Sequence, residues 1–403
     1  MTTLPPKPTI FRLNLLGDVM LGRLIDQLFP AHVHEPSEAR VVSNIRSQAQ
    51  YARLASYGPR SPWGNALPLL HEADLTLINL ETAATTHNTK WPDKVFNYRM
   101  HPVNISALNA AKVDYASLAN NHSLDFSEPG LLETVRTVKG AKIAFAGAGE
   151  NREEACRPAV LTLPSTKCRN QANVEHGNRV ECAQKEPDAR EYNIHVYSAS
   201  DHPHDWKSSF HTRASTTNTD DSIPSTTSPV QSTWYDRFSP PALKVFSVHW
   251  GPNYRWRPSS EIRSLAHWLI DVCGVDIVHG HSSHHVQGVE IYKERLIVYG
   301  CGDFVDDYAV NDEFRNDLSA VWRVSVEPVR VEGGEGKGEG GLRVKSLEVF
   351  PTRIERFQAE VLEQGDPDHG FVVHKVRALS KEMGTVAREE LGGKGQLIFE
   401  LEG

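Results

Sequence analysis

Four histidines occur within seven consecutive residues of this chain, directly after a short apolar run at 275–278. These histidines are His279, His281, His284 and His285. Imidazole is a common metal ligand and carries protons near neutral pH, so a cluster of imidazoles at the end of a strand is typical of a functional site. A second apolar run, 296–299, ends at two glycines and Asp303. We interpret His279 and His285 as structural residues, which leaves His281 and His284 for chemistry.

The same pattern, an apolar run followed by a metal-capable side chain, occurs four more times in the chain. Asp18 follows 10–16, Glu81 follows 75–79, Asn121 and His122 follow 114–118, and His249 follows 243–248. Because the carboxyl ends of parallel strands form the crevice in which ligands bind, we expect these side chains to converge. Each one alone has a simpler interpretation, as a turn or cap residue or as a buried histidine, but the repetition favours one common site.

The expected set combines two carboxylates, one amide and several imidazoles. Such a mixture of oxygen and nitrogen ligands suits Zn²⁺, Mn²⁺ or Fe, and a shared carboxylate could hold two ions. Two ions at such a site bind a phosphoryl group and lower the pKa of a water between them. The sequence therefore predicts a divalent-metal site with one or two ions.

The elements that must position this site are clearest around His249. A strand is expected at 243–248, a helix at 260–272 and a strand at 275–278. The helix has an apolar stripe at helical spacing, formed by Ile262, Leu265, Ala266, Leu269 and Ile270. Strand, helix and strand at this spacing predict a βαβ unit with parallel strands. Further strands are expected at 142–146, 193–198, 321–328, 343–350 and 396–400, and further helices at 38–56, 105–112, 127–139 and within 370–402. This alternation predicts an α/β fold.

Two polar stretches, 165–191 and 207–240, interrupt the pattern. We expect both to be surface insertions of low order, since they lack the apolar residues needed to build a core. We interpret 9–360 as one domain that contains these insertions, and 361–403 as a C-terminal extension that packs on the same domain.

Composition narrows the class of protein. The 403 residues carry a formal charge of −8, which argues against general nucleic-acid binding. The sequence shows no signal peptide and no apolar stretch long enough for a membrane span, so we expect a cytoplasmic location. The five cysteines are odd in number and contain no CxxC pair, so no disulfide framework is expected.

Five motifs in order resemble the CapA family of capsule and poly-γ-glutamate biosynthesis proteins, which is related to the calcineurin-like metallophosphoesterases. The motifs are GDVMLGR at 17–23, INLET at 78–82, LANNHSLDF at 118–126, VHWG at 248–251, and the stretch 280–307 that begins GHSSHH and ends GCGDFVDD. The resemblance implies a calcineurin-like sandwich of two mixed β-sheets flanked by helices. It also implies a metal site at the ends of the strands.

The resemblance further implies roles for individual residues. Asp18 is similar to the first-motif aspartate, Glu81 to a carboxylate that bridges two ions, Asn121 to the amide ligand, His122 to the general acid, and His249, His281 and His284 to the later imidazole ligands. The chain departs from the pattern at Met20, where relatives have a histidine, and at Asp303, where the family usually has asparagine. A thioether is a poor ligand for a hard ion, so the number of bound ions can be one or two.

These features favour a metal-dependent hydrolase that acts on a phosphoester or amide-type bond through a metal-activated water. Arg23 and Arg99 are candidates to hold an anionic small-molecule or peptide substrate, although both could simply be solvated surface residues. The alternative is a non-catalytic, accessory role in the biosynthesis of poly-γ-glutamate or a related polymer. A third possibility is a degenerate metallophosphatase fold with only a structural role.

Overall fold

A large mixed β-sheet forms one half of the computed structural model, which describes residues 9–164, 191–201, 240–329 and 340–401. The sheet has nine strands in the order β16-β15-β14-β1-β2-β5-β6, with β13 paired to β1 and β17 paired to β15. Its strands are β1 (Phe11–Val19), β2 (Leu75–Leu80), β5 (Tyr115–Ser117), β6 (Ala144–Ala146), β13 (Asp303–Val305), β14 (Leu318–Pro328), β15 (Leu342–Glu355), β16 (Gln358–Val361) and β17 (Leu397–Glu400). Strands β1, β2, β5 and β6 run parallel, whereas β14 to β17 pair antiparallel.

A second mixed sheet packs against the first. It has six strands in the order β11-β12-β10-β9-β8-β7. They are β7 (Ala159–Leu163), β8 (Tyr192–Ser200), β9 (Leu243–His249), β10 (Ile277–His281), β11 (Val289–Tyr292) and β12 (Arg295–Val298). The four inner strands are parallel and the two edge strands, β7 and β11, are antiparallel to their neighbours. A short parallel pair, β3 (Ala83–Ala84) and β4 (Arg99–Met100), lies apart from both sheets.

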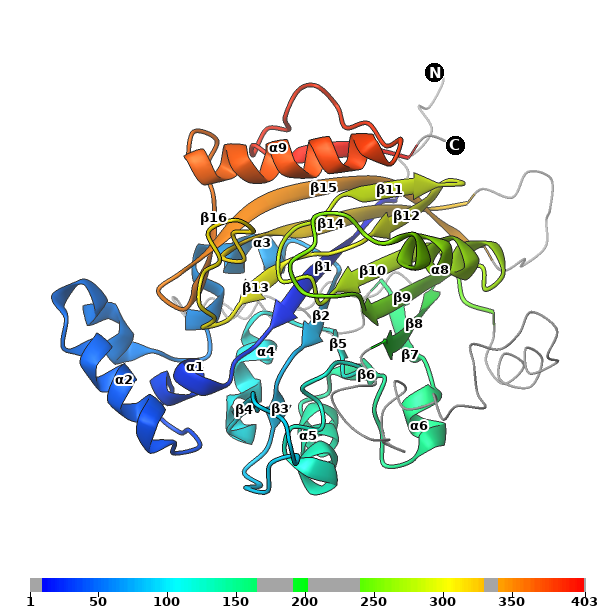
Figure 1. The fold of residues 1–403 in the computed structure, drawn as a ribbon. Coiled ribbons are helices and arrows are strands. Elements are labelled where there is room, and N and C mark those ends of the chain that lie inside the picture. Colours follow the sequence, from blue (N-terminus) through cyan, green and yellow to red (C-terminus); the bar gives the residue numbers. More distant parts are fainter. Residues whose placement is uncertain (1–8, 165–190, 202–239, 330–339, 402–403) are drawn as a thin grey trace, which may run out of the picture.

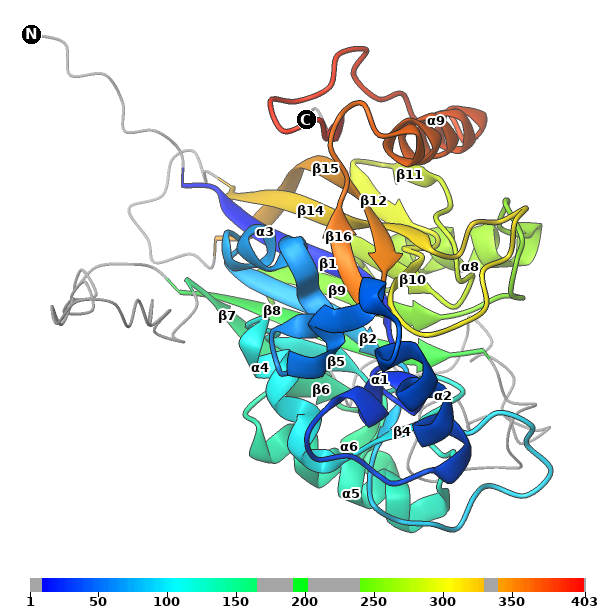
Figure 2. The ribbon, with the colours of Figure 1, turned by 90° about the vertical axis from the view of Figure 1, so that its left-hand side faces the viewer.

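Helices cover the outer faces of the two sheets. The α-helices are α1 (Arg23–Leu28), α2 (Pro36–Arg46), α3 (Leu67–His71), α4 (Ser106–Ala110), α5 (Ser127–Gly140), α6 (Arg152–Cys156), α8 (Ser260–Asp271) and α9 (Pro367–Glu382), and 3₁₀ turns are η1 (Ala49–Ser56), η2 (Ser61–Ala66) and η3 (Pro102–Ile105). Figures 1 and 2 show α9 along one edge of both sheets, where it contacts β11, β14 and β15. None of the helices in the described ranges is long and apolar enough to cross a bilayer.

The period-two alternation of the strands explains this layering. In β1, Leu13 and Leu15 join the core between the two sheets, whereas Leu16 joins the core under the helices of the first sheet. In β10, Ile277 faces the inter-sheet core and Val278 faces α8. Successive side chains of a strand point to opposite faces, so a strand buried on both sides is apolar throughout. The result is four layers: helices, sheet, sheet and helix.

The predicted α/β fold with two mixed sheets is therefore confirmed, as is the βαβ unit, since β9 and β10 are parallel neighbours joined through α8. The single helix expected at 38–56 is instead α2 followed by the 3₁₀ segment η1, so that prediction was wrong in detail. The expected insertions at 165–191 and 207–240 lie outside the described residues except at their edges. The three cysteines in the described part, Cys156, Cys273 and Cys301, form no disulfide with one another.

Candidate metal centre

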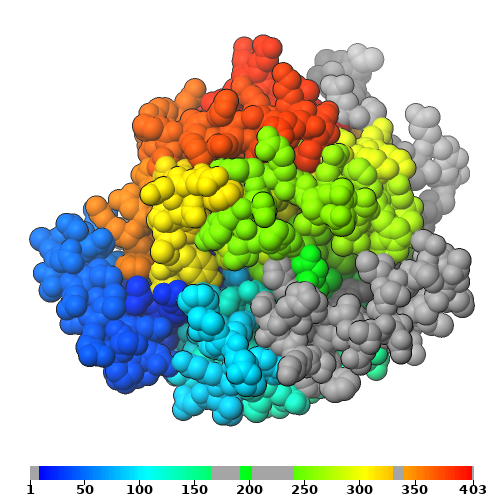
Figure 3. Space-filling model, viewed as in Figure 1, coloured from blue at the N-terminus to red at the C-terminus, as the bar shows by residue number. Residues whose placement is uncertain are grey.

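Strands from both sheets bring four of the expected residues to one buried place. Asp18 lies near the end of β1, Glu81 follows β2, and His249 and His281 are the last residues of β9 and β10. All four are at most 1% exposed. His249 and His281 are directly opposite each other in the parallel register of β9 and β10, so their side chains emerge side by side. Segments far apart in the chain therefore meet at this site, and Figure 3 shows blue, cyan, green and yellow segments also adjoining on the surface of the molecule.

Gly17 allows the backbone just before β13 to approach β1 closely. A Cβ atom on Gly17 would lie 1.8 Å from the carbonyl oxygen of Gly302, so only glycine fits here. The backbone of 300–303 can then approach β1, where Asp18 pairs in parallel register with Asp303 of β13. Beyond Asp18 the register shifts. The close approach places a second carboxylate beside Asp18.

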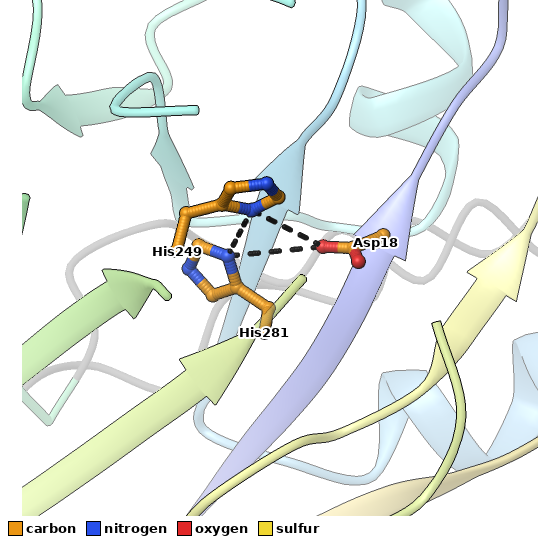
Figure 4. A group of neighbouring side chains, drawn as sticks. All are labelled: Asp18, His249 and His281. Atoms are coloured by element: carbon orange, nitrogen blue, oxygen red, sulfur yellow. Dashed lines mark hydrogen bonds and ion pairs between the residues drawn. The ribbon is translucent and has the colours of Figure 1, made fainter. Parts of the chain in front are cut away.

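Asp18, His249 and His281 form the first ligand group, shown in Figure 4. The Nδ1 atoms of His249 and His281 are 2.9 Å apart, and they lie 4.0 and 3.7 Å from Oδ1 of Asp18. A point equidistant from these three atoms lies about 2.1 Å from each, which is the length of Zn–N and Zn–O bonds in proteins. The triangle thus has the size that a divalent ion requires.

A second ligand group comprises Asp18, Glu81, His284 and Asp303. Each offers one ligand atom, and these atoms all lie within 4.8 Å of one another. Nδ1 of His284 is 2.9 Å from Oδ1 of Asp303. Asp18 is the carboxylate common to both ligand groups, whereas the sequence resemblance implies the bridging role for Glu81.

Unpaired oxygens test whether the site suits a cation. Within the described ranges, neither carboxylate oxygen of Glu81 has a hydrogen-bond partner, and both are inaccessible to solvent. Oδ1 of Asn121 is also buried without a hydrogen bond to any described residue. Burial raises the pKa of Glu81 well above its ordinary value, and the nearby charges of Asp18 and Asp303 raise this pKa further. A bound cation would satisfy these oxygens and offset the repulsion, so the donor set fits a divalent metal.

Asp303 is a candidate ligand that was not among the predicted metal-binding residues. Burial raises its pKa well above the ordinary value, and the charge of Asp18 acts in the same direction. The neighbouring Asp306 is buried too, and its pKa is raised by burial and by Asp303. The available signal was the apolar run at 296–299, which Asp303 follows as Asp18 follows 10–16. Met20 is fully buried, and its sulfur accepts a hydrogen bond from the Gly22 amide at 3.2 Å.

His122 lies beside the second ligand group. Its Nε2 atom is 3.8 Å from Oε1 of Glu81, and its Nδ1 atom is 2.6 Å from Oδ2 of Asp125. The ring stacks on Tyr98, with 4.0 Å between ring centroids. Lys94 contacts the other oxygen of Asp125 at 2.6 Å. Burial lowers the pKa of His122, and the charge of Asp125 opposes that shift. The ring is therefore fixed in one orientation with Nε2 facing the carboxylates.

Two asparagines missed by the sequence analysis hold Asp18 in place. Asn79 donates to Oδ1 of Asp18 at 2.7 Å, and Asn120 donates to Oδ1 of Asn79 at 2.9 Å. Both lie in the quoted motifs INLET and LANNHSLDF, which was the only signal for them. Asn121, predicted as the amide ligand, is partly buried beside them.

The loop after β10 has an unusual backbone. Ser282 and His284 have φ values of 96° and 62°, in the left-handed region that non-glycine residues rarely occupy. The Ser282 amide donates to Oδ2 of Asp18 at 3.2 Å, and the twist at 284 directs that imidazole toward Asp303. Strain of this kind is found where surrounding structure enforces it, frequently at functional sites.

The other two histidines of the cluster are His279 and His285. His279 is fully buried, and burial lowers its pKa to about 4. Its Nε2 atom lies 2.7 Å from the carbonyl oxygen of Leu16. His285 stacks on Trp256, with 4.6 Å between ring centroids. Neither of these two histidines belongs to the two ligand groups.

The two predicted substrate arginines differ in their surroundings. Arg23 is 3.5 Å from Asp307 and lies over the Tyr98 ring, with 31% of its side chain exposed. Arg99 is only 8% exposed and bonds to Glu35 and to the carbonyl of His87. The partners of Arg99 indicate that its guanidinium holds together the loops around α2 and β4. Arg23 is the better placed of the two to meet a ligand.

Comparisons with known proteins lead to the same family. The model of the family "Bacterial capsule synthesis protein PGA_cap" matches residues 12–308. A probable polyglutamine synthesis accessory protein of Mycobacterium tuberculosis is 32% identical over 391 residues, covering 94% of this chain and 93% of that protein. The capsule biosynthesis protein CapA of Bacillus anthracis is 23% identical, covering 81% of this chain and 68% of that protein. The PGA biosynthesis protein CapA of Bacillus subtilis is 21% identical, covering 73% and 63%.

Proposed function

The chain belongs to the bacterial capsule synthesis protein PGA_cap family, and from this premise we propose that it is a metal-dependent hydrolase of phosphoester or amide-type bonds. The observation that carries the proposal is the Glu81 carboxylate. It is fully buried, and both of its oxygens lack a hydrogen bond within the described residues, beside Asp18 and Asp303. Buried charges in proteins are normally paired or coordinate a metal, so this carboxylate favours a bound cation as its partner.

The two ligand groups would hold one or two divalent ions, with Asp18 shared between them. Mixed carboxylate and imidazole ligands favour Mn, Zn or Fe over Mg or Ca. When bound, such an ion supplies Lewis acidity, which lowers the pKa of water and polarises a substrate oxygen. We also propose that the two mixed sheets form a calcineurin-like metallophosphoesterase sandwich, because the candidate ligands follow the strands in the order of that family's motifs.

His122 would donate a proton to the leaving group. Its Nδ1–H donates to Asp125, which leaves Nε2 facing the ligand groups. Asp125 is itself held by Lys94 and by the Tyr98 amide, at 2.6 Å each. The carboxylate stabilises the imidazolium, as expected of a residue that orients a general acid. Arg23 would contribute a positive charge at the edge of the site for an anionic substrate.

An accessory role is the second candidate function. It is favoured by the name of the Mycobacterium tuberculosis relative, a probable accessory protein, and by Met20 in place of a histidine ligand. In that role the centre would bind a polymer or a partner without cleaving it. A stable biosynthetic partner captured with this chain, and full function after loss of His249, would support this second candidate.

Elemental analysis of the freshly purified protein tests the hydrolase proposal first. We expect Mn, Zn or Fe, which His281→Ala should lose. His285→Phe is the matched control, because His285 is in the same loop but stacks on Trp256, so this variant should keep the metal. The loaded protein should then hydrolyse a phosphoester or a γ-glutamyl amide in a substrate screen. A metal-free protein that binds none of these ions would overturn the proposal.

A further inference from the structure

A chain of hydrogen bonds runs from His281 to a backbone carbonyl through two buried side chains. Nε2 of His281 is 3.1 Å from Oγ of Ser247, and the same oxygen is 3.2 Å from Nδ1 of His279. Nε2 of His279 is 2.7 Å from the carbonyl oxygen of Leu16. Ser247, His279 and His281 are all 0% exposed, so these contacts replace contacts with solvent.

The strand register explains why these groups meet. Ser247 and His249 lie two residues apart on β9, and His279 and His281 lie two residues apart on β10. The register pairs Ser247 with His279 and His249 with His281. Because side chains repeat every two residues along a strand, all four lie on the same face of the second sheet. The outer pair carries the first ligand group, and the inner pair lies directly behind it.

The direction of each hydrogen bond in this series follows from its last acceptor, the carbonyl oxygen of Leu16. The carbonyl oxygen of Leu16 can only accept, so Nε2 of His279 carries a proton. With one ring proton, held at Nε2, His279 accepts at Nδ1, and Ser247 donates its single hydroxyl proton there. The oxygen of Ser247 must then accept from Nε2 of His281. The remaining nitrogen of His281, Nδ1, is left with a lone pair.

We propose that Ser247 and His279 are positioning residues that hold His281 in its Nε2–H tautomer, so that Nδ1 is ready to bind a cation. Nδ1 is the atom that lies 3.7 Å from Asp18 and 2.9 Å from Nδ1 of His249. A metal-binding histidine commonly donates its other N–H to a neighbouring group, which fixes both its tautomer and its orientation. The inference rests on the proposed metal centre, but the tautomer itself can be measured without metal.

Nuclear magnetic resonance of the metal-stripped, ¹⁵N-histidine-labelled full chain tests the tautomer directly. The ring nitrogens of His281, assigned from the signals missing in His281→Asn, should show a protonated Nε2 and an unprotonated Nδ1. A protonated Nδ1, or a mixture of both tautomers, would overturn the inference. The result does not depend on hydrolysis, so it stands apart from success or failure of the proposed function.

Metal affinity provides the second readout. Ser247→Ala should lower the affinity for Mn²⁺, measured by titration calorimetry, by about 10- to 100-fold. Ser247→Thr keeps the hydroxyl and should restore most of that affinity. The matched control is Ser198→Ala, a buried serine directly opposite Ser247 on β8, whose hydroxyl pairs with Ser117 instead of a ligand. Unchanged affinity in folded Ser247→Ala, or an equal loss in Ser198→Ala, would overturn the inference. If Ser247→Ala does not fold, the tautomer measurement on the wild-type chain decides.

Discussion

Replacing Glu81 by glutamine tests the proposed reason for its burial. In the metal-free protein this carboxylate is inaccessible, its oxygens lack hydrogen bonds within the described ranges, and it lies near the charges of Asp18 and Asp303. A glutamine of nearly the same shape cannot ionise and provides an NH₂ group that can donate to those neighbours. We therefore expect Glu81→Gln to stabilise the metal-free protein, contrary to the usual effect of a substitution at a fully buried position.

The expected magnitudes follow from the same contacts. A buried polar group without a partner costs about 1–3 kcal/mol, so metal-free Glu81→Gln should gain about that much free energy of unfolding. At a metal concentration 100 times the dissociation constant, the wild-type chain gains about 2.7 kcal/mol from binding. If the substitution weakens binding 100-fold, the variant gains only about 0.4 kcal/mol at the same concentration. Metal should thus stabilise the wild type far more than the variant.

Urea unfolding with a chelator and with excess Mn²⁺ measures both effects. Glu290→Gln is a matched control, because Glu290 is also a buried glutamate but bonds to Arg263, His267 and Tyr299. That control should lose stability in both conditions and keep its full response to metal. The reasoning is refuted if Glu81→Gln destabilises the metal-free protein as Glu290→Gln does, or if Mn²⁺ stabilises Glu81→Gln as much as the wild type.

Three further outcomes are expected. Asp303→Asn should keep the first ligand group intact but weaken the second, so that the Mn²⁺ bound per chain falls below that of the wild type by elemental analysis; an unchanged Mn²⁺ content would contradict this. Asp125→Asn should reduce turnover about 100-fold with unchanged metal content, since His122 loses the group that orients it, and a loss of metal instead would argue against that role. Burial and the charge of Asp307 raise the pKa of Glu38 to about 7. The folded chain therefore holds this proton up to about pH 7 whereas the unfolded chain releases it near pH 4.3, so stability falls as pH rises through that window. Glu38→Gln should raise the free energy of unfolding by about 1 kcal/mol at pH 8 after solvent screening and leave it unchanged below pH 4, and equal effects at both pH values would contradict this.

Much of the fold could be predicted from the sequence, because the strands of this protein are short apolar runs with clear ends. A parallel strand buried on both faces must be apolar, and its carboxyl end opens toward the crevice where polar residues are useful. For this reason Asp18, His249 and His281 could be expected to lie together although they are far apart in the chain. The structure places them in one triangle.

Other parts of the site depend on contacts that no local pattern reveals. Asp303 lies beside Asp18 only because the Gly17 and Gly302 backbones pack tightly and β13 joins the sheet there. The salt bridge between Arg99 and Glu35 joins residues that are 64 positions apart in the chain, and no spacing in the sequence reveals it. Tertiary packing, and not spacing along the chain, determines which polar groups pair.

An anomalous difference map from crystals of the chain grown with Mn²⁺ tests the central claim most directly. The account predicts a peak between Asp18, His249 and His281, with a second peak against Glu81 and Asp303 when both positions are filled. A map collected on the two sides of the manganese edge identifies the element at each peak. Mn²⁺ peaks at other positions in the crystal, together with no peak between Asp18 and His281, would contradict the assignment of this site as a metal centre.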